Sequence, residues 1–135
     1  MAFQFSDAAR NAALDAMETA IGTAPILEIR SGTVPADTAT ADSGTVLATM
    51  TLPTDWLAAA SGGAKALSGT WEDTSADADG TAGHFRIKDS GGTVTHIQGT
   101  VTATGGGGDM TLGNTSIATG QSISITSFTL TAGGA

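Results

Sequence analysis

Residues 84–101 read HFRIKDSGGTVTHIQGTV, and this segment carries the clearest strand pattern in the chain. In its first half, apolar and polar residues alternate with the two-residue period of a β-strand. One face therefore carries Phe85 and Ile87, and the other carries His84, Arg86 and Lys88. The sequence DSGG at 89–92 supplies turn residues. In the returning half, one face is expected to carry Thr95, Ile97, Gly99 and Val101. The pattern predicts an antiparallel β-hairpin.

On both sides of the hairpin, further short segments have strand character. They cover residues 26–30, 45–52, 64–71, 109–112 and 121–131, with turn or loop sequence between them, including an acidic loop at 72–83 and a turn at 114–120. No helical segment separates the later strands, which argues against parallel βαβ units. We therefore predict a mostly-β fold, an antiparallel β-sandwich or barrel of about six to eight strands with one N-terminal α-helix.

The last predicted strand contains a change of phase. Ile123 and Ile125 are odd-numbered, whereas Phe128 and Leu130 are even-numbered, so a regular strand would place the two pairs on opposite faces. A β-bulge near Thr126–Ser127 would restore a single apolar face, and a strand covered on both faces is the alternative. The bulge is the preferred interpretation.

The N-terminal segment predicts the one helix. Ser6 is a suitable N-cap, residues 8–20 are rich in helix formers, and Gly22 is a natural stop before Pro25. Residues 53–60 could hold one more helical turn. We expect a single domain over 1–135, with an arm and helix at 1–22 and a β-sandwich at 26–135.

Charge and composition exclude several classes of function. The net charge is −8, from 13 acidic and 5 basic residues, so the chain is expected to bind neither nucleic acid nor an anionic membrane. It has no cysteine, which excludes disulfides and cysteine-ligated zinc. The N-terminus lacks a signal-peptide pattern and no segment is long and apolar enough to span a membrane, so we expect synthesis in a cytoplasm.

A search for catalytic or metal-binding patterns predicts no enzyme and no cofactor. The two histidines, His84 and His96, are expected to be exposed on a polar sheet face, and no nucleophile elbow occurs. In the acidic loop, aligning Gly80 with the glycine of an EF-hand places Asp77 and Asp79 at ligand positions, but Arg86 then replaces the essential glutamate. An EF-hand is rejected, and a looser calcium site in this loop stays open.

The remaining candidates concern contacts with other proteins. Apolar residues of the arm, the helix and the segment after Pro53 are candidate interface residues, namely Phe3, Phe5, Leu14, Met17, Ile21, Trp56 and Leu57. Burial in the core is the preferred interpretation for Trp56 and also for Trp71. Core and interface are equally favoured for Phe3.

Eight short segments of the sequence are distinctive, and they lie at residues 1–6, 11–15, 18–22, 52–57, 83–87, 96–99, 114–117 and 127–132. Together these segments resemble a family of small structural proteins of tailed-bacteriophage virions, similar to head decoration (cement) proteins. The resemblance covers nearly the whole chain, contains no catalytic signature and brings no functional residues with it.

The resemblance implies a capsid decoration protein that assembles in the bacterial cytoplasm and sits on the capsid exterior. Its partner would be the major capsid protein, and it would form a homo-oligomer, with a trimer favoured. Two alternatives stay open at this point. One is a tail or head–tail connector component, and the other is a carbohydrate- or calcium-dependent adhesion module.

Overall fold

The computed structural model describes residues 3–134, which form one α-helix and ten β-strands. The elements are α1 (Asp7–Ile21), β1 (Ile26–Ser31), β2 (Val46–Thr51), β3 (Ala64–Ala66), β4 (Trp71–Asp73), β5 (Gly80–Lys88), β6 (Thr95–Ala103), β7 (Met110–Leu112), β8 (Ser116–Ile117), β9 (Ile123–Ile125) and β10 (Thr129–Thr131). The mostly-β class with one N-terminal helix is confirmed.

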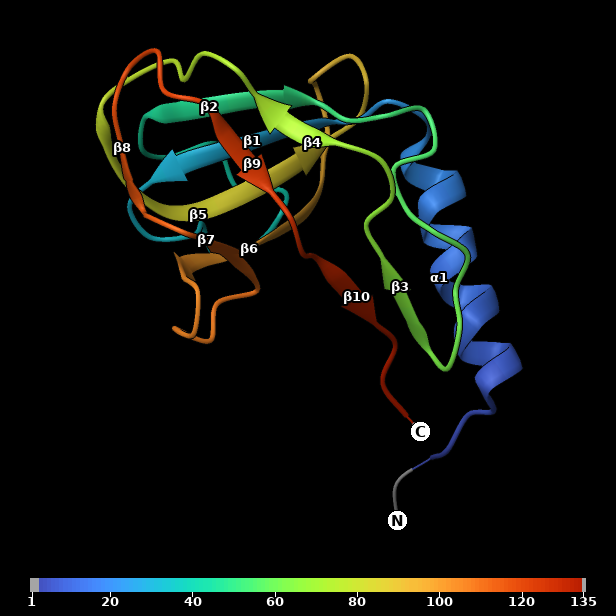
Figure 1. The fold of residues 1–135 in the computed structure, drawn as a ribbon. Helices are drawn as coiled ribbons and strands as arrows, with labels where there is room; N and C mark the ends of the chain where they lie inside the picture. Colours follow the sequence, from blue (N-terminus) through green and yellow to red (C-terminus); the bar gives the residue numbers. More distant parts are fainter. Residues whose placement is uncertain (1–2, 135) are drawn as a thin grey trace.

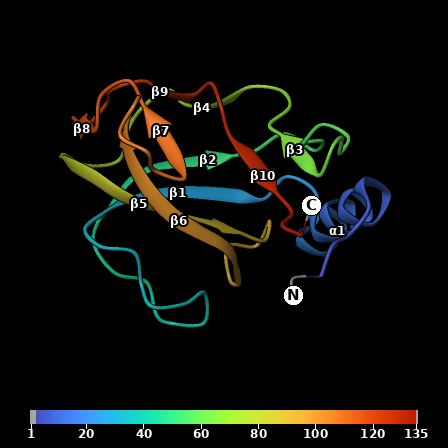
Figure 2. The same cartoon turned by 90° about the horizontal axis from the view of Figure 1, so that it is seen from below.

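The strands form a curled sheet and two small ladders. The sheet has the order β2-β1-β5-β6-β7, and β8 pairs with the start of β5. The β4–β9 ladder crosses over this sheet as a second layer, and the β3–β10 ladder continues it toward α1 (Figure 1). The helix, the arm before it and the segment after β10 lie together beyond one end of the sheet (Figure 2). This arrangement agrees with the predicted sandwich or barrel.

The predicted helix is confirmed, and its ends follow from local chemistry. The hydroxyl of Ser6 accepts a hydrogen bond from the backbone N–H of Ala9 at 3.1 Å, which caps the first turn. Gly22 ends the helix with φ of +94°, and its N–H donates to the carbonyl of Glu18.

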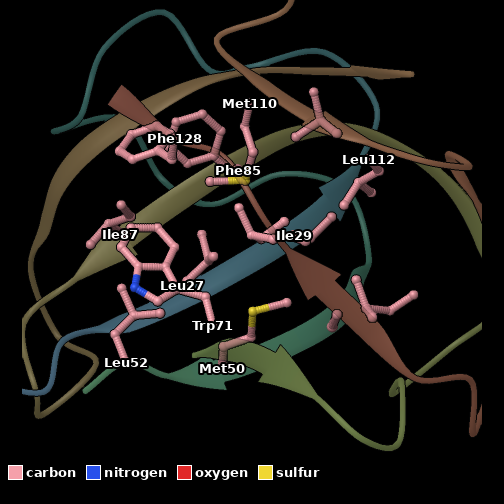
Figure 3. Close-up of a cluster of buried hydrophobic side chains, with 14 of the residues drawn as sticks. Leu27, Ile29, Met50, Leu52, Trp71, Phe85, Ile87, Met110, Leu112 and Phe128 are labelled. Atoms are coloured by element: carbon pink, nitrogen blue, oxygen red, sulfur yellow. The ribbon is translucent and has the colours of Figure 1, made fainter. Parts of the chain in front are cut away.

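The core lies between the curled sheet and the β4–β9 ladder (Figure 3). Aromatic rings link the two layers: Phe85 of β5 contacts Phe128 edge-on with centroids 5.6 Å apart, and Phe128 contacts Trp71 at 5.5 Å. Trp56 extends the series at 6.1 Å from Trp71. Both Trp residues are buried, so the core interpretation of Trp56 and Trp71 is confirmed.

Two segments predicted as continuous strands are each divided in two. Residues 64–71 form β3 and β4, and residues 121–131 form β9 and β10. The breaks lie opposite each other, where the N–H of Leu67 donates to the carbonyl of Phe128. The change of phase predicted near Thr126–Ser127 is therefore present as a break between ladders, and the predicted bulge is wrong.

Other local expectations also need correction. Residues 53–60 contain no helical turn, because Leu57 forms a β-bridge with Leu67. Strand β8 lies inside the predicted turn at 114–120, and β4 and β5 occupy both ends of the predicted loop at 72–83. Strands β6 and β7 are joined by a short glycine-rich connection and pair in parallel. The other ladders are antiparallel, as predicted.

The hairpin is confirmed, with one error in its second strand. The register passes from Ile87 opposite Ile97 to Lys88 opposite Thr95, so His96 is the extra residue of a bulge. Thr95 is therefore on the outer face, where its hydroxyl accepts from Arg86, and not on the face of Ile97 as predicted.

We expect Phe128→Ala to destabilise the fold by about 3–5 kcal/mol, because it removes the ring that joins Phe85 to Trp71. Phe3→Ala is the matched control, since Phe3 is 89% exposed and should change stability by less than about 0.5 kcal/mol. Urea denaturation followed by tryptophan fluorescence measures both. Equal stability of the two variants would contradict this account of the core.

Candidate functional site

All five basic side chains of the protein are turned inward. Arg10, Arg30, Lys65, Arg86 and Lys88 lie within the described residues, each is at most 9% exposed, and each forms a salt bridge. Most of the acidic side chains lie at the surface. The exterior charge of the molecule is therefore carried by carboxylates.

Three of these bases form a cluster on the outer face of the sheet. Arg30 of β1 and Arg86 and Lys88 of β5 converge on Asp42, with N–O distances of 3.1, 2.9 and 2.6 Å. Glu28 accepts from Arg30 at 2.8 Å and from Lys88 at 3.0 Å. We call these five residues the outer ion cluster.

Asp42 belongs to the β1–β2 connection, residues 32–45, which folds over the outer face. The backbone carbonyl of Asp37, from the same connection, accepts from Arg86 at 3.1 Å. The connection also covers His84, whose Nδ1 lies 3.0 Å from the carbonyl oxygen of Gly32. The expectation that His84 is exposed is therefore wrong, because it did not allow for this cover, whereas His96 is exposed as predicted.

A pocket of about 500 Å³ opens beside the outer ion cluster, between the β1–β2 connection and the β5–β6 turn. Its basic side chains are Arg86 and Lys88, and both are already bonded to Asp42. An anionic ligand would have to displace that carboxylate. The geometry is that of a structural ion network beside an open pocket.

The other two bases fasten α1 to the β3–β10 ladder. Lys65 of β3 contacts Asp15 at 2.7 Å and Glu18 at 3.1 Å. Arg10 pairs with Asp7 and also donates to the carbonyl of Ala132 at 3.3 Å. A Cβ at Gly63 would lie 2.2 Å from the Arg10 guanidinium, so only glycine allows this close approach.

The acidic loop that was considered for calcium has a structural role. Asp73 accepts from the N–H of Thr49 at 3.0 Å, Asp77 accepts from the Thr49 hydroxyl at 2.8 Å, and Asp79 accepts from the N–H of Thr119 at 2.7 Å. Over residues 3–134, no three potential metal ligands of the His, Cys, Asp or Glu type come together. The loop covers the free edge of β2.

The predicted interface residues divide into two sets. Phe3, Phe5 and Met17 are 89%, 56% and 44% exposed. The other four, Leu14, Ile21, Trp56 and Leu57, are buried within the protomer. Their assignment to a surface contact is corrected, because they hold the helix and the segment after Pro53 against the fold. The arm has no regular secondary structure, and the N–H of Phe5 donates to the carbonyl of Gly134.

The outer ion cluster was missed in the sequence, although one signal for it exists. Arg86 and Lys88 alternate with apolar residues on the hairpin, and they are two of only five bases in the chain. A long connection that contains Asp37 and Asp42 was available to neutralise them. The alternation of residues along the hairpin does not show that this connection folds over it.

Comparison of the chain with family models, curated proteins and solved structures finds no match. The resemblance to tailed-phage virion proteins therefore stays a prediction. In the part of the chain that the structure describes, no helix has the length and apolar character needed to cross a membrane.

We expect Asp42→Asn to lower the free energy of unfolding at pH 7 by about 1–3 kcal/mol, since three buried bases lose their shared anion. The hydrogen bond from Lys88, with the charges of Arg30 and Lys88 and a bond from Arg86, holds the pKa of Asp42 below its usual value of 3.8. The stabilisation is thus complete above pH 3.8 and is lost as the pH falls through the lower folded-state pKa.

Thermal unfolding between pH 2 and 7 measures this dependence. The Asp42→Asn protein should show a flatter stability profile below pH 4 than the unmodified protein. Asp55→Asn, which removes the same charge from an exposed site, should keep the original profile. An unchanged acid profile in Asp42→Asn would show that Asp42 does not hold the connection in place.

Proposed function

We propose that this protein is a structural component of a tailed-bacteriophage virion, a decoration protein that binds the outside of the capsid shell and braces it. The observation that carries the proposal is the pair of exposed rings on the N-terminal arm. Phe3 and Phe5 are among the few large apolar side chains left at the surface of the described residues. Exposed aromatic residues are common anchors of protein–protein interfaces.

The geometry of the arm supports a role in contact. Phe3 and Phe5 lie two residues apart just before the helix cap, and their side chains are 89% and 56% exposed, so both rings are available to a partner surface. The arm is also fixed at its base, because Phe5 bonds to Gly134 and Ser6 caps α1. A pre-positioned arm loses less conformational entropy on binding than a free one.

The charge distribution supports a protein partner. With its basic side chains paired internally, the exterior presents carboxylates, which repel phosphate-rich nucleic acid. Acidic exteriors attract basic surfaces and keep a protein soluble at high concentration. The major capsid protein is the partner we propose, with the decoration protein bound as a homo-oligomer, a trimer being favoured.

The double substitution Phe3→Ser and Phe5→Ser should remove the protein from the particle without unfolding it. Both rings are exposed, so the melting temperature should stay within a few degrees of the original. Quantitative mass spectrometry of purified virions should show at least a tenfold loss of the protein. Val94→Ser, at a 50% exposed apolar site on the β5–β6 turn, is the control and should leave the copy number unchanged.

Copy number and position also test the assignment itself. A decoration protein is present in hundreds of copies over the shell, and cryo-electron microscopy would show it there. Localisation to the tail alone, at six to a few dozen copies, would instead identify a tail or connector component and overturn the proposal.

A further inference from the structure

A groove of about 330 Å³ is lined by residues of strands β6 and β10. Ile97 and Gln98 form one wall, and residues 129–131 form the other. The buried rings of Phe85 and Phe128 lie at its base, and Asp109 provides its charged group. Ile97 and Leu130 are only partly buried, although both pack against the core.

The β6 wall offers backbone groups with no strand beside them. Strand β6 pairs with β5 along its first part and with β7 only from Val101 onward. The N–H of Thr100 donates to the Asp109 carboxylate at 3.0 Å, so it points away from β5. Because backbone groups alternate along a strand, the N–H and C=O of Gln98 point the same way, into the groove.

The β10 wall is arranged in the same manner. The carbonyl of Phe128 accepts from Leu67 at 2.9 Å, and the N–H of Ala132 donates to Gly63 at 2.9 Å. The backbone groups of these even-numbered residues therefore point toward β3. By alternation, those of Thr129 and Thr131 point toward the groove, and within residues 3–134 no strand pairs with them there.

The contrast with β2 shows that these edges are unprotected. The free edge of β2 is closed by Asp73, which accepts from Thr49, and by the N–H of Asp77, which donates to the carbonyl of Leu47. The β6 wall is closed only at Thr100, and the β10 wall contains neither proline nor a charged residue. Exposed strand edges promote aggregation unless they are covered or used for binding.

We propose that this groove binds an extended segment of a partner protein by β-strand addition. The segment would hydrogen-bond to Gln98 on one side and to Thr129 and Thr131 on the other, and its alternate apolar side chains would cover Phe85 and Phe128. A basic residue of the segment would lie beside Asp109. This inference goes beyond the virion role and does not depend on the arm residues Phe3 and Phe5.

Charge complementarity selects the partner. The chain has a net charge of −8, its five bases are engaged internally, and Asp109 is the charged group of the groove. A second copy of this chain would bring the same negative charge to the contact. A basic, strand-forming segment of another protein gains attraction instead, and this attraction should weaken as salt rises.

The test uses the full chain and the peptide acetyl-Lys-Val-Thr-Val-Thr-Val-Lys-amide as the probe. Its matched control has the same side chains but N-methyl groups on both threonine nitrogens, which removes two hydrogen-bond donors. Fluorescence anisotropy should show at least about tenfold weaker binding of the methylated peptide. Amide hydrogen exchange by NMR should slow at Gln98, Thr129 and Thr131 when the unmethylated peptide is bound.

Two variants test the charged end of the groove. Asp109→Asn keeps an oxygen that can accept from Thr100 and should weaken binding of the peptide roughly 2- to 5-fold at low salt. Asp55→Asn, which makes the same charge change at an exposed site, should leave binding unchanged.

Several outcomes would overturn the proposal. These are equal binding of the two peptides, protection of amides elsewhere instead of at the groove, and no binding at 1 mM peptide. Sedimentation of the protein alone gives a fourth: a concentration-dependent dimer that protects the same three amides would assign the groove to a second copy. None of these outcomes affects the virion test, which relies on Phe3 and Phe5.

Discussion

The contact of Phe128 with Phe85 and Trp71 is the interaction on which the fold depends. The chain has only four Phe, two Trp and no Tyr, so large rings cannot be spread through the core. Phe128 lies at the break between β9 and β10, and its ring touches the sheet on one side and the β4–β9 ladder on the other. One side chain thereby joins the two layers, and its position at a strand break lets the chain change direction there.

Ion pairs hold in place the segments that make few contacts with this small apolar core. The β1–β2 connection and α1 both contain few large apolar residues, yet each is held by buried bases, through Asp42 in one case and through Asp15 and Glu18 in the other. Removing one partner of such a network leaves a buried charge uncompensated, which makes each carboxylate important for the segment that carries it. The same pairing leaves the exterior acidic, so stability and surface charge have a common origin.

Local sequence patterns predicted the helix, the hairpin and the mostly-β class, because caps, turns and alternation act over a few residues. They failed where distant segments meet. The burial of His84 depends on Gly32 from the β1–β2 connection. The buried positions of Leu57 and Trp56 likewise follow from distant contacts. Leu57 bridges to Leu67, just after β3, and the Trp56 indole donates to the carbonyl of Gly22 at the end of α1. The sequence pattern alone did not show whether the arm residue Phe3 is exposed or buried.

Some strand edges of this fold are covered and others are open, and the open edges are where a partner strand could bind. An acidic loop closes β2, and the parallel partner β7 covers the second half of β6. The edges of β6 and β10 that face each other lie above Phe85 and Phe128, the same rings that join the layers. A strand added there would extend the apolar cover of the core and supply the hydrogen bonds that these edges lack. Binding in this groove would therefore stabilise the fold itself, so partner affinity and protein stability should rise together.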